Sequence, residues 1–153
     1  TSMEQGRRAA CHALGLDLGR QGDLAPAGIY TIPELGSVGM TEQQVRERFG
    51  DALVGRAKFE EVARGQISAA ENGLLKLVVH PETGVVLGAH AAGESATELV
   101  HIGQMAIIAG LNFETFIDTV FNFPTFAEAY RVAAFDLLKQ HRARASAKPA
   151  AAE

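Results

Sequence analysis

The sequence predicts an α+β domain built on an antiparallel sheet, with helices packed on one face of that sheet. Short β-branched and apolar segments fill the middle of the chain, and the two longest helical patterns follow them. A Pro-Glu-Thr-Gly sequence at 81–84 separates two of the apolar segments, and its proline and glycine suit a tight hairpin turn. Because strands come first and helices follow, we expect antiparallel pairing rather than alternating βαβ units.

The predicted strands are short segments rich in β-branched, apolar and aromatic residues. Proline cannot donate a hydrogen bond to a ladder, so Pro33 is expected to end the first strand. After the hairpin turn, apolar alternation resumes in Val85, Leu87 and Ala89. The strands predicted before that turn cover residues 29–33, 53–59, 62–69 and 74–79.

The predicted helices begin and end at recognisable capping residues. Thr41 is expected to cap a helix that Gly50 ends. Thr125, with Glu128 three residues later, forms a capping-box pattern at the start of the last long helix. The pattern at 95–109 is apolar on most sides and predicts a largely buried helix. In full, the predicted helices cover residues 1–14, 41–50, 95–109 and 125–140.

The chain is expected to hold one folded domain and the end of another. Residues 1–14 are interpreted as a helix whose own domain begins before this chain, because Thr1 opens directly on helical periodicity. Residues 15–27 are rich in glycine and proline and are interpreted as a linker. Residues 28–140 form the predicted domain, and residues 141–153 are expected to be a disordered tail of low complexity.

Composition argues against several classes of protein. The net charge is -4 and the pI is about 5.7, unlike the basic footprint of most nucleic-acid-binding domains. The sequence has no run of about 18 apolar residues that could span a membrane. Its single cysteine, Cys11, cannot form a disulfide within the chain. We therefore expect a cytoplasmic protein without nucleic-acid or membrane partners.

The sequence contains no local motif for nucleotide or metal chemistry, such as Gly-x-Gly-x-x-Gly or His-Glu-x-x-His. Glu98 and His101 have the Glu-x-x-His spacing of di-iron helices, but such sites need two copies, so no metal site is expected. Cys11 is interpreted as a small buried helix residue rather than a reactive thiol, although Arg7 and Arg8 lie one turn away. The chain is expected to catalyse nothing alone.

The most informative stretch is the aromatic cluster at 121–130, which reads Phe-Asn-Phe-Pro-Thr-Phe-Ala-Glu-Ala-Tyr. Aromatic rings supply a large buried area with few rotatable bonds. A cluster at the junction of a loop and a helix is typical of a local core. It is equally typical of a contact with another chain or with a flat aromatic cofactor. The residues alone leave these alternatives open.

Three longer segments carry a resemblance to a known family. They read IYTIPELGSVGMTE at 29–42, TGVVLGAHAAGESATELVHIGQMAI at 83–107 and FNFPTFAEAYRVAA at 121–134. They resemble the C-terminal dimerisation domain of the flavoprotein pyridine nucleotide-disulfide oxidoreductase superfamily. Within it, the details are most similar to the soluble pyridine nucleotide transhydrogenases, which exchange hydride between NADPH and NAD. The resemblance covers about residues 1–140 and implies that residues 1–14 are the terminal helix of a preceding FAD-binding domain.

Position 123 separates members of this superfamily. Its disulfide reductases carry His-Pro-Thr-x-x-Glu near the C-terminus, where the histidine, held by the glutamate, acts as acid and base towards thiols of the partner subunit. In this chain Phe123 occupies the histidine position and Glu128 matches the glutamate. A phenyl ring cannot carry a proton. The resemblance therefore implies no catalytic residue in this chain and disfavours disulfide reduction.

The resemblance also implies a division of labour. The chain would be the C-terminal dimerisation fragment of an FAD-dependent NAD(P) transhydrogenase, with FAD and NAD(P) bound by N-terminal domains and no cofactor held by this fragment alone. Residues 28–140 would form a homodimer with two-fold symmetry. Asn122, Phe123 and Pro124 would contact the flavin of the partner subunit, and the electron chemistry would belong to the cofactor.

Two alternatives to this interpretation are open. A non-catalytic, free-standing module that only dimerises would also lack nucleotide motifs. A different oxidoreductase of the same superfamily, with a quinone or another non-thiol acceptor, would also have no need of the histidine. A Cys-x-x-x-x-Cys pair upstream of this chain would restore a disulfide-reductase assignment despite Phe123.

Overall fold

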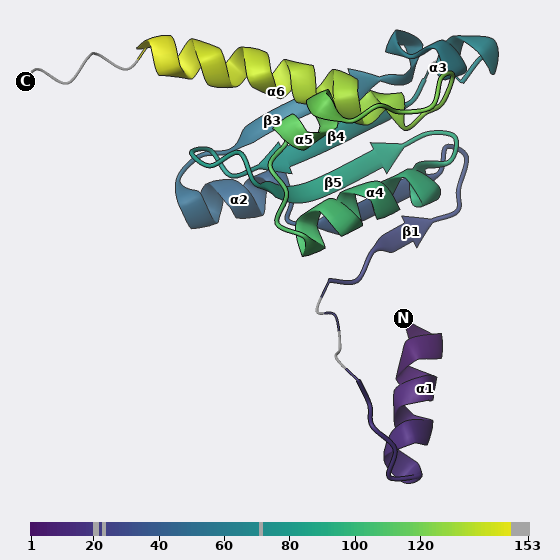
Figure 1. The fold of residues 1–153 in the computed structure, drawn as a ribbon. Coiled ribbons are helices and arrows are strands. Elements are labelled where there is room, and N and C mark those ends of the chain that lie inside the picture. The colour runs from purple at the N-terminus through teal and green to yellow at the C-terminus, as the bar shows by residue number, and fades with distance from the viewer. Residues whose placement is uncertain (20–21, 23, 71, 148–153) are drawn as a thin grey trace, which may run out of the picture.

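A five-stranded antiparallel sheet forms the centre of the molecule, with strand order β1-β2-β5-β4-β3 (Figure 1). The structure is a computed structural model that describes residues 1–19, 22, 24–70 and 72–147. Its elements confirm the predicted α+β class. They are α1 (Ser2–Ala13), β1 (Ala27–Ile29), β2 (Leu35–Gly39), α2 (Glu42–Phe49), β3 (Leu53–Lys58), the 3-10 helix η1 (Phe59–Glu61), α3 (Ala63–Ile67), β4 (Leu74–Val79), β5 (Val86–Ala92), α4 (Ala96–Ile108), α5 (Glu114–Asp118) and α6 (Glu128–Ala147).

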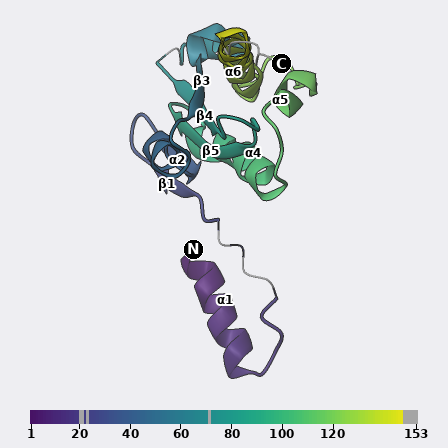
Figure 2. The ribbon, with the colours of Figure 1, turned by 90° about the vertical axis from the view of Figure 1, so that its left-hand side faces the viewer.

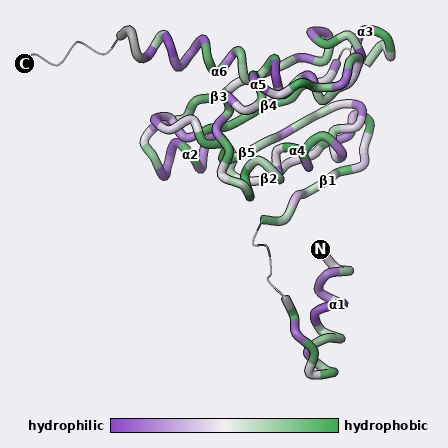
Figure 3. The backbone as a smooth tube through the Cα atoms, in the orientation of Figure 1, coloured by the Kyte–Doolittle hydropathy of each residue, from purple (hydrophilic) through white to green (hydrophobic). Residues whose placement is uncertain are grey.

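The two long helices of the domain share one face of the sheet, as predicted. α4 packs on β2 and β5, and α6 packs on β3 and β4, with buried side chains such as Leu77 and Leu137 between the layers. The short helix α2 covers a corner of the opposite face, where Val45 packs against Val54 and Val78. Figure 2 shows the sheet between α2 and α4. In Figure 3, hydrophobic residues predominate in β4, whereas α2 and α6 alternate in hydropathy, as expected for surface helices.

The hairpin between β4 and β5 confirms the turn predicted at 81–84. The backbone N–H of His80 donates to the carbonyl of Val85 at 2.9 Å, and that of Gly84 donates to the carbonyl of His80 at 3.0 Å. Gly84 has a φ of 71°, a left-handed conformation that glycine adopts without a steric penalty. The turn therefore fixes the register of the two central strands.

The predicted caps of α2 are also present. The side chain of Thr41 accepts a hydrogen bond from the Gln44 N–H at 3.2 Å, and the Gln44 side chain accepts one from the Thr41 N–H at 2.8 Å. Gly50 ends the helix with a φ of 80°. The capping residues that the sequence predicts therefore form both ends of α2 in the folded domain.

One predicted strand was wrong, and one strand was not predicted. The segment predicted as a strand at 62–69 contains α3, in which backbone bonds such as Ser68 N–H to Arg64 O join residues four apart. Its apolar residues face different environments, since Val62 is buried and Ile67 is exposed. Conversely, β2 was not predicted, because two glycines and a serine in Leu35–Gly39 favour a loop. Gly36 is required there, since a Cβ would lie 2.5 Å from the carbonyl oxygen of Ala96 in α4.

The strand predicted at 29–33 is displaced towards the N-terminus. β1 occupies Ala27–Ile29 and pairs with β2, so only Ile29 belongs to both the predicted and the observed strand. The residues that follow form an exposed loop with a cis peptide bond between Ile32 and Pro33.

The C-terminal residues differ from the predicted tail of 141–153. Residues 141–147 continue α6, and residues 148–153 lie outside the described part of the chain. Alanine and arginine favour helix. In addition, the Arg144 guanidinium pairs with the Asp51 carboxylate at 2.6 Å and holds this part of α6 beside the start of β3.

At the N-terminus, α1 confirms a helix within residues 1–14 but has no buried residue. It stands apart from the sheet in Figures 1 and 2. Met3 on this helix is almost fully exposed, and its assignment to a preceding domain stays a prediction. Within the described residues, no helix combines the length and the hydropathy needed to cross a membrane.

Candidate functional site

The connection between α5 and α6 carries a short exposed segment, Asn122–Pro124. Phe123 is 74% exposed, although phenylalanine usually lies in a core. A cis peptide bond joins it to Pro124. This exposed segment contains all three residues that the family resemblance predicts to contact a flavin.

Buried aromatic residues hold both ends of the exposed segment. Phe121, before it, is partly buried against the main core. Phe126, after it, is 7% exposed, and its ring lies 4.7 Å from that of Phe59. The aromatic cluster therefore divides, because two of its three phenylalanines pack against the core and the third faces outward, where a contact with another chain or a cofactor stays a prediction.

Glu128 stabilises the start of α6. Its carboxylate accepts a hydrogen bond from the backbone N–H of Thr125 at 3.3 Å, which is one half of the predicted capping box. The Thr125 hydroxyl does not complete the box but donates to the carbonyl of Asn122 at 2.7 Å. Together these bonds tie the exposed segment to the first turn of α6.

The chemistry of the exposed segment suits contact rather than catalysis. Phe123 has no proton to transfer, and its flat ring can pack against another aromatic system. The N–H and carbonyl of Phe123 make no hydrogen bond with any described residue, so both are available to a partner. These groups fit a flat, polar-edged ring such as a flavin. Because the segment carries no cationic side chain, the phosphates of a dinucleotide would be held elsewhere.

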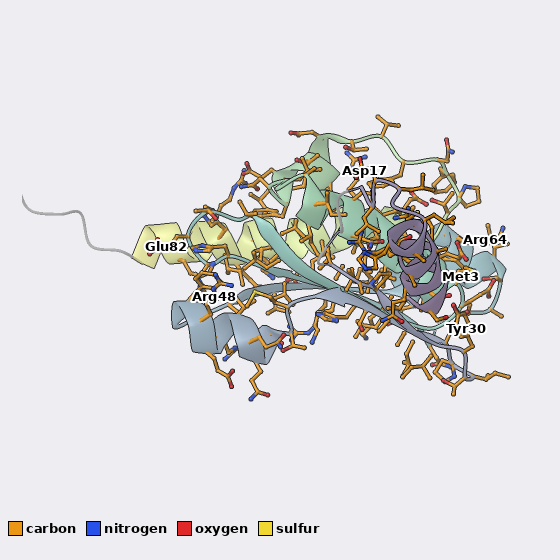
Figure 4. All side chains as sticks on the ribbon, turned by 90° about the horizontal axis from the view of Figure 1, so that it is seen from below. Met3, Asp17, Tyr30, Arg48, Arg64 and Glu82 are labelled. Atoms are coloured by element: carbon orange, nitrogen blue, oxygen red, sulfur yellow. The ribbon has the colours of Figure 1, made fainter. Side chains whose placement is uncertain are left out.

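A second exposed loop was missed as a candidate site by the sequence analysis. It follows β1 and presents Tyr30 and Ile32, and Figure 4 shows Tyr30 at the periphery of the domain. A groove of about 500 Å³ lies beside it, between the loop, the α3–β4 connection and the start of α4. The assignment of 29–33 to a strand concealed this loop. In the sequence, the indication of an exposed turn is the proximity of Tyr30 to Pro33.

Glu34 closes this second loop and caps α4. Its carboxylate accepts a hydrogen bond from the Thr97 N–H at 3.1 Å, and its carbonyl accepts one from the Gly93 N–H at 2.8 Å. Ser95 makes no side-chain cap, so Glu34 supplies the anionic group that favours a helix N-terminus. The Glu34 carboxylate therefore stabilises the N-terminus of α4.

The outward side of α4 combines polar and apolar side chains. Met105 is 56% exposed and Ile108 is 61% exposed, and both are suited to contact with another protein surface. His101 pairs through Nδ1 with the side-chain oxygen of Gln104 at 2.9 Å, rather than with Glu98. No group of three or more potential metal ligands occurs among the described residues.

Cys11 lies on α1, away from the exposed segment. Its sulfur accepts a long hydrogen bond of 3.8 Å from Arg7, and the residue is partly exposed rather than buried as expected. The guanidinium of Arg7 is itself paired with the carboxylate of Glu4 on the same helix. The structure therefore does not bring Cys11 together with Phe123 or Glu128.

Comparison with known proteins identifies the domain. A family described as the pyridine nucleotide-disulphide oxidoreductase dimerisation domain matches residues 25–134, most of the sheet and its helices. The chain belongs to this family. The resemblance that the sequence indicated is thereby confirmed.

The relatives that match this chain are longer proteins, each named as a transhydrogenase. The chain is 48% identical over 143 residues to the soluble pyridine nucleotide transhydrogenase of Mycobacterium tuberculosis, a match that covers 94% of this chain and 31% of that protein. It is 46% identical over 142 residues to the transhydrogenase of Azotobacter vinelandii, with 91% of this chain and 31% of that protein covered. The chain thus spans about a third of the length of these relatives and matches their C-terminal portion.

Solved structures share the fold at lower identity. LpdA from Mycobacterium tuberculosis superposes with a TM-score of 0.72 and 27% identity, over 87% of this chain and 29% of that chain. The HOCl-induced flavoprotein disulfide reductase RclA from Escherichia coli gives a TM-score of 0.73 and 27% identity, over 84% of this chain and 30% of that chain. The dimerisation domain therefore shares the fold of about a third of a flavoprotein disulfide reductase.

Proposed function

We propose that this chain is the dimerisation part of an FAD-dependent pyridine nucleotide transhydrogenase, which exchanges hydride between NADPH and NAD. Identities of 48% and 46% to proteins named soluble pyridine nucleotide transhydrogenase support this activity. The domains that bind FAD and NAD(P) would belong to the remainder of the enzyme, and the enzyme would work in the cytoplasm. The dimerisation domain would pair two copies through residues 28–140.

The observation that carries the proposal is the exposed ring of Phe123 on a segment fixed by its neighbours. In the disulfide reductases to which the sequence is similar, a histidine at this position moves protons to and from thiols. Phe123 cannot do so, and Glu128 instead caps α6. Hydride exchange between two nicotinamides needs no thiol relay, so the phenyl ring is compatible with transhydrogenation.

Within this proposal, Asn122, Phe123 and Pro124 contact the flavin of the partner subunit. When bound, the flavin would accept hydride from one nicotinamide and deliver it to the other. The residues of this chain would place an apolar ring over one edge of the cofactor and exclude water. Backbone groups of Phe123 would offer hydrogen bonds to the polar atoms of that edge.

The test replaces Phe123 with alanine in the full-length enzyme. We expect faster oxygen consumption by the reduced enzyme or slower hydride exchange, by about tenfold if one well-packed aromatic contact is lost. Phe135→Ala is the matched control, because Phe135 is an exposed phenylalanine of the same domain on α6. Unchanged kinetics together with an unchanged flavin spectrum in Phe123→Ala would refute the contact.

The likeness to a flavoprotein disulfide reductase favours one alternative function, namely disulfide reduction. A redox-active Cys-x-x-x-x-Cys pair upstream of this chain, with thiol-dependent reductase activity in the full-length protein, would favour it. An upstream sequence without such a pair, in a protein that purifies with bound flavin, would favour transhydrogenation or another non-thiol acceptor. A natural gene product that consists of this domain alone and purifies without colour would identify a module that only dimerises.

A further inference from the structure

The hydroxyl of Tyr130 bridges two backbone groups of another helix. Tyr130 lies near the start of α6, and its side chain is fully buried. Its Oη donates a hydrogen bond to the carbonyl of Leu99 at 2.7 Å and accepts one from the N–H of Gly103 at 3.0 Å. Residues 99 and 103 are four apart, and a regular α-helix joins such a carbonyl and N–H directly. Tyr130 therefore takes part in the hydrogen-bond ladder of α4.

Gly103 makes this approach possible. A Cβ on residue 103 would lie 3.0 Å from the Tyr130 Oη and 2.3 Å from the Cβ of Ala89 in β5. The absent side chain lets the hydroxyl reach the backbone of α4 while the helix lies close to the sheet. Burial raises the pKa of the Tyr130 phenol, so the hydroxyl stays protonated and can donate and accept at once.

The same ring meets both flanks of the exposed segment Asn122–Pro124. The ring of Tyr130 contacts that of Phe116 in α5 with centroids 4.9 Å apart. α5 precedes the exposed segment, and α6, which carries Tyr130, follows it, so this ring contact joins the two helices that frame the segment. That side chain is in turn bonded to α4, whose outward side carries Met105 and Ile108.

We propose that Tyr130 is a positioning residue that holds the exposed segment Asn122–Pro124 in a fixed place relative to α4. The role does not require Tyr130 to touch a cofactor or substrate. It rests on the proposed function in one respect, namely that the domain pairs two copies and Phe123 contacts the flavin of the partner subunit. Tyr130 then links α4, whose exposed Met105 and Ile108 suit a contact with that subunit, to the placement of the phenyl ring.

The first test compares the chain with its Tyr130→Phe variant by nuclear magnetic resonance. The variant keeps the ring and removes the bridging hydroxyl. We expect exchange of the Gly103 amide hydrogen to become about tenfold faster, which corresponds to the loss of one ordinary hydrogen bond. We also expect backbone order parameters at Asn122 and Phe123 to fall from near 0.85, a rigid value, towards about 0.6.

Val132→Ala is the matched control, because Val132 packs against the core from the same helix and its side chain cannot form a hydrogen bond with α4. It should lower the stability of the domain and leave the order parameters of the exposed segment unchanged. If Tyr130→Phe also leaves them unchanged, or if both variants lower them equally, Tyr130 is only a core residue and the positioning role is overturned.

The second test uses the full-length, flavin-bound enzyme. Tyr130→Phe should raise oxygen consumption in the same direction as Phe123→Ala, with little change in the KM for either nicotinamide. A mobile exposed segment combined with unaltered oxygen consumption and flavin spectrum would support the positioning role and refute the flavin contact. The two proposals therefore fail through different measurements.

Discussion

Gly103 is a residue at which α4 lies close against the sheet. In a solvated helix, replacing glycine by alanine favours folding by about 0.5–1 kcal/mol. At Gly103 the added Cβ would lie 2.3 Å from the Cβ of Ala89, so the overlap outweighs that gain. We predict that Gly103→Ala destabilises the domain by about 1–3 kcal/mol, the usual cost of overpacking, measured by urea denaturation. Gly6→Ala should not lower stability, because its Cβ would meet no atom within 4 Å.

His90 is the residue that we expect to make the stability of the domain depend on pH. Its ring lies on the open face of the sheet with Nε2 3.1 Å from the carbonyl oxygen of Met40. Burial lowers the pKa of His90 below its usual value of 6.5, and the positive charge of Lys76 on β4 adds to this effect. Glu42 faces the same region and pairs with Lys76 at 3.8 Å.

The unfolded chain therefore binds a proton at His90 more readily than the folded chain does. The stability contributed by neutral His90 is fully present above pH 6.5 and is lost as the pH falls through the lower pKa of the folded state. We predict that the urea midpoint of the domain falls between pH 7 and pH 5. It should fall less in His90→Gln, and an equal fall in both proteins would contradict this assignment.

At the scale of elements, Arg144 ties the C-terminal part of α6 to the start of β3, because it pairs with Asp51 and donates to the carbonyl of Ala52 at 3.4 Å. Asp51 has a lowered pKa, chiefly because its carboxylate accepts the backbone N–H of Ala52, with a further contribution from Arg144. We predict that Arg144→Ala increases hydrogen exchange in the last turns of α6 but lowers global stability by less than about 1 kcal/mol, because the pair is largely exposed. Arg142→Ala, an exposed arginine half a turn away, should leave exchange in those turns unchanged.

The elements also differ in how well local sequence specifies them. The capped helix α2 and the hairpin between β4 and β5 were predicted because their capping and turn residues act locally. β2 was missed, since Gly36 is explained only by the carbonyl oxygen of Ala96 that lies above it. α3 was misread as a strand because Val62 and Ile67 favour extended structure individually, whereas short-range backbone bonds decide the fold there.

At the scale of the whole molecule, the dimerisation domain exposes apolar side chains that a monomer would leave in water. Met105 lies on the outward side of α4 and is the position that we predict to control self-association. Met105→Asp should shift sedimentation of the chain from dimer towards monomer at micromolar concentration, because a buried, unpaired carboxylate opposes association. Ile67→Asp is the matched control on α3. A monomeric parent chain would contradict the interface.

The sequence by itself determined the fold class, the family and the identity of the residue at position 123, because these depend on residue types and their spacing. Apart from the family resemblance, which implied an outward contact for Phe123, it could not decide which phenylalanine of the cluster faces solvent. Phe126 and Phe123 are chemically identical, and only the packing of Phe126 on Phe59 separates them. Nor could it reveal the bridge from Tyr130 to α4, since Leu99 and Gly103 lie about 30 residues away in the chain. Tertiary structure decided both, because burial and hydrogen bonding between distant segments exist only after the helices dock on the sheet.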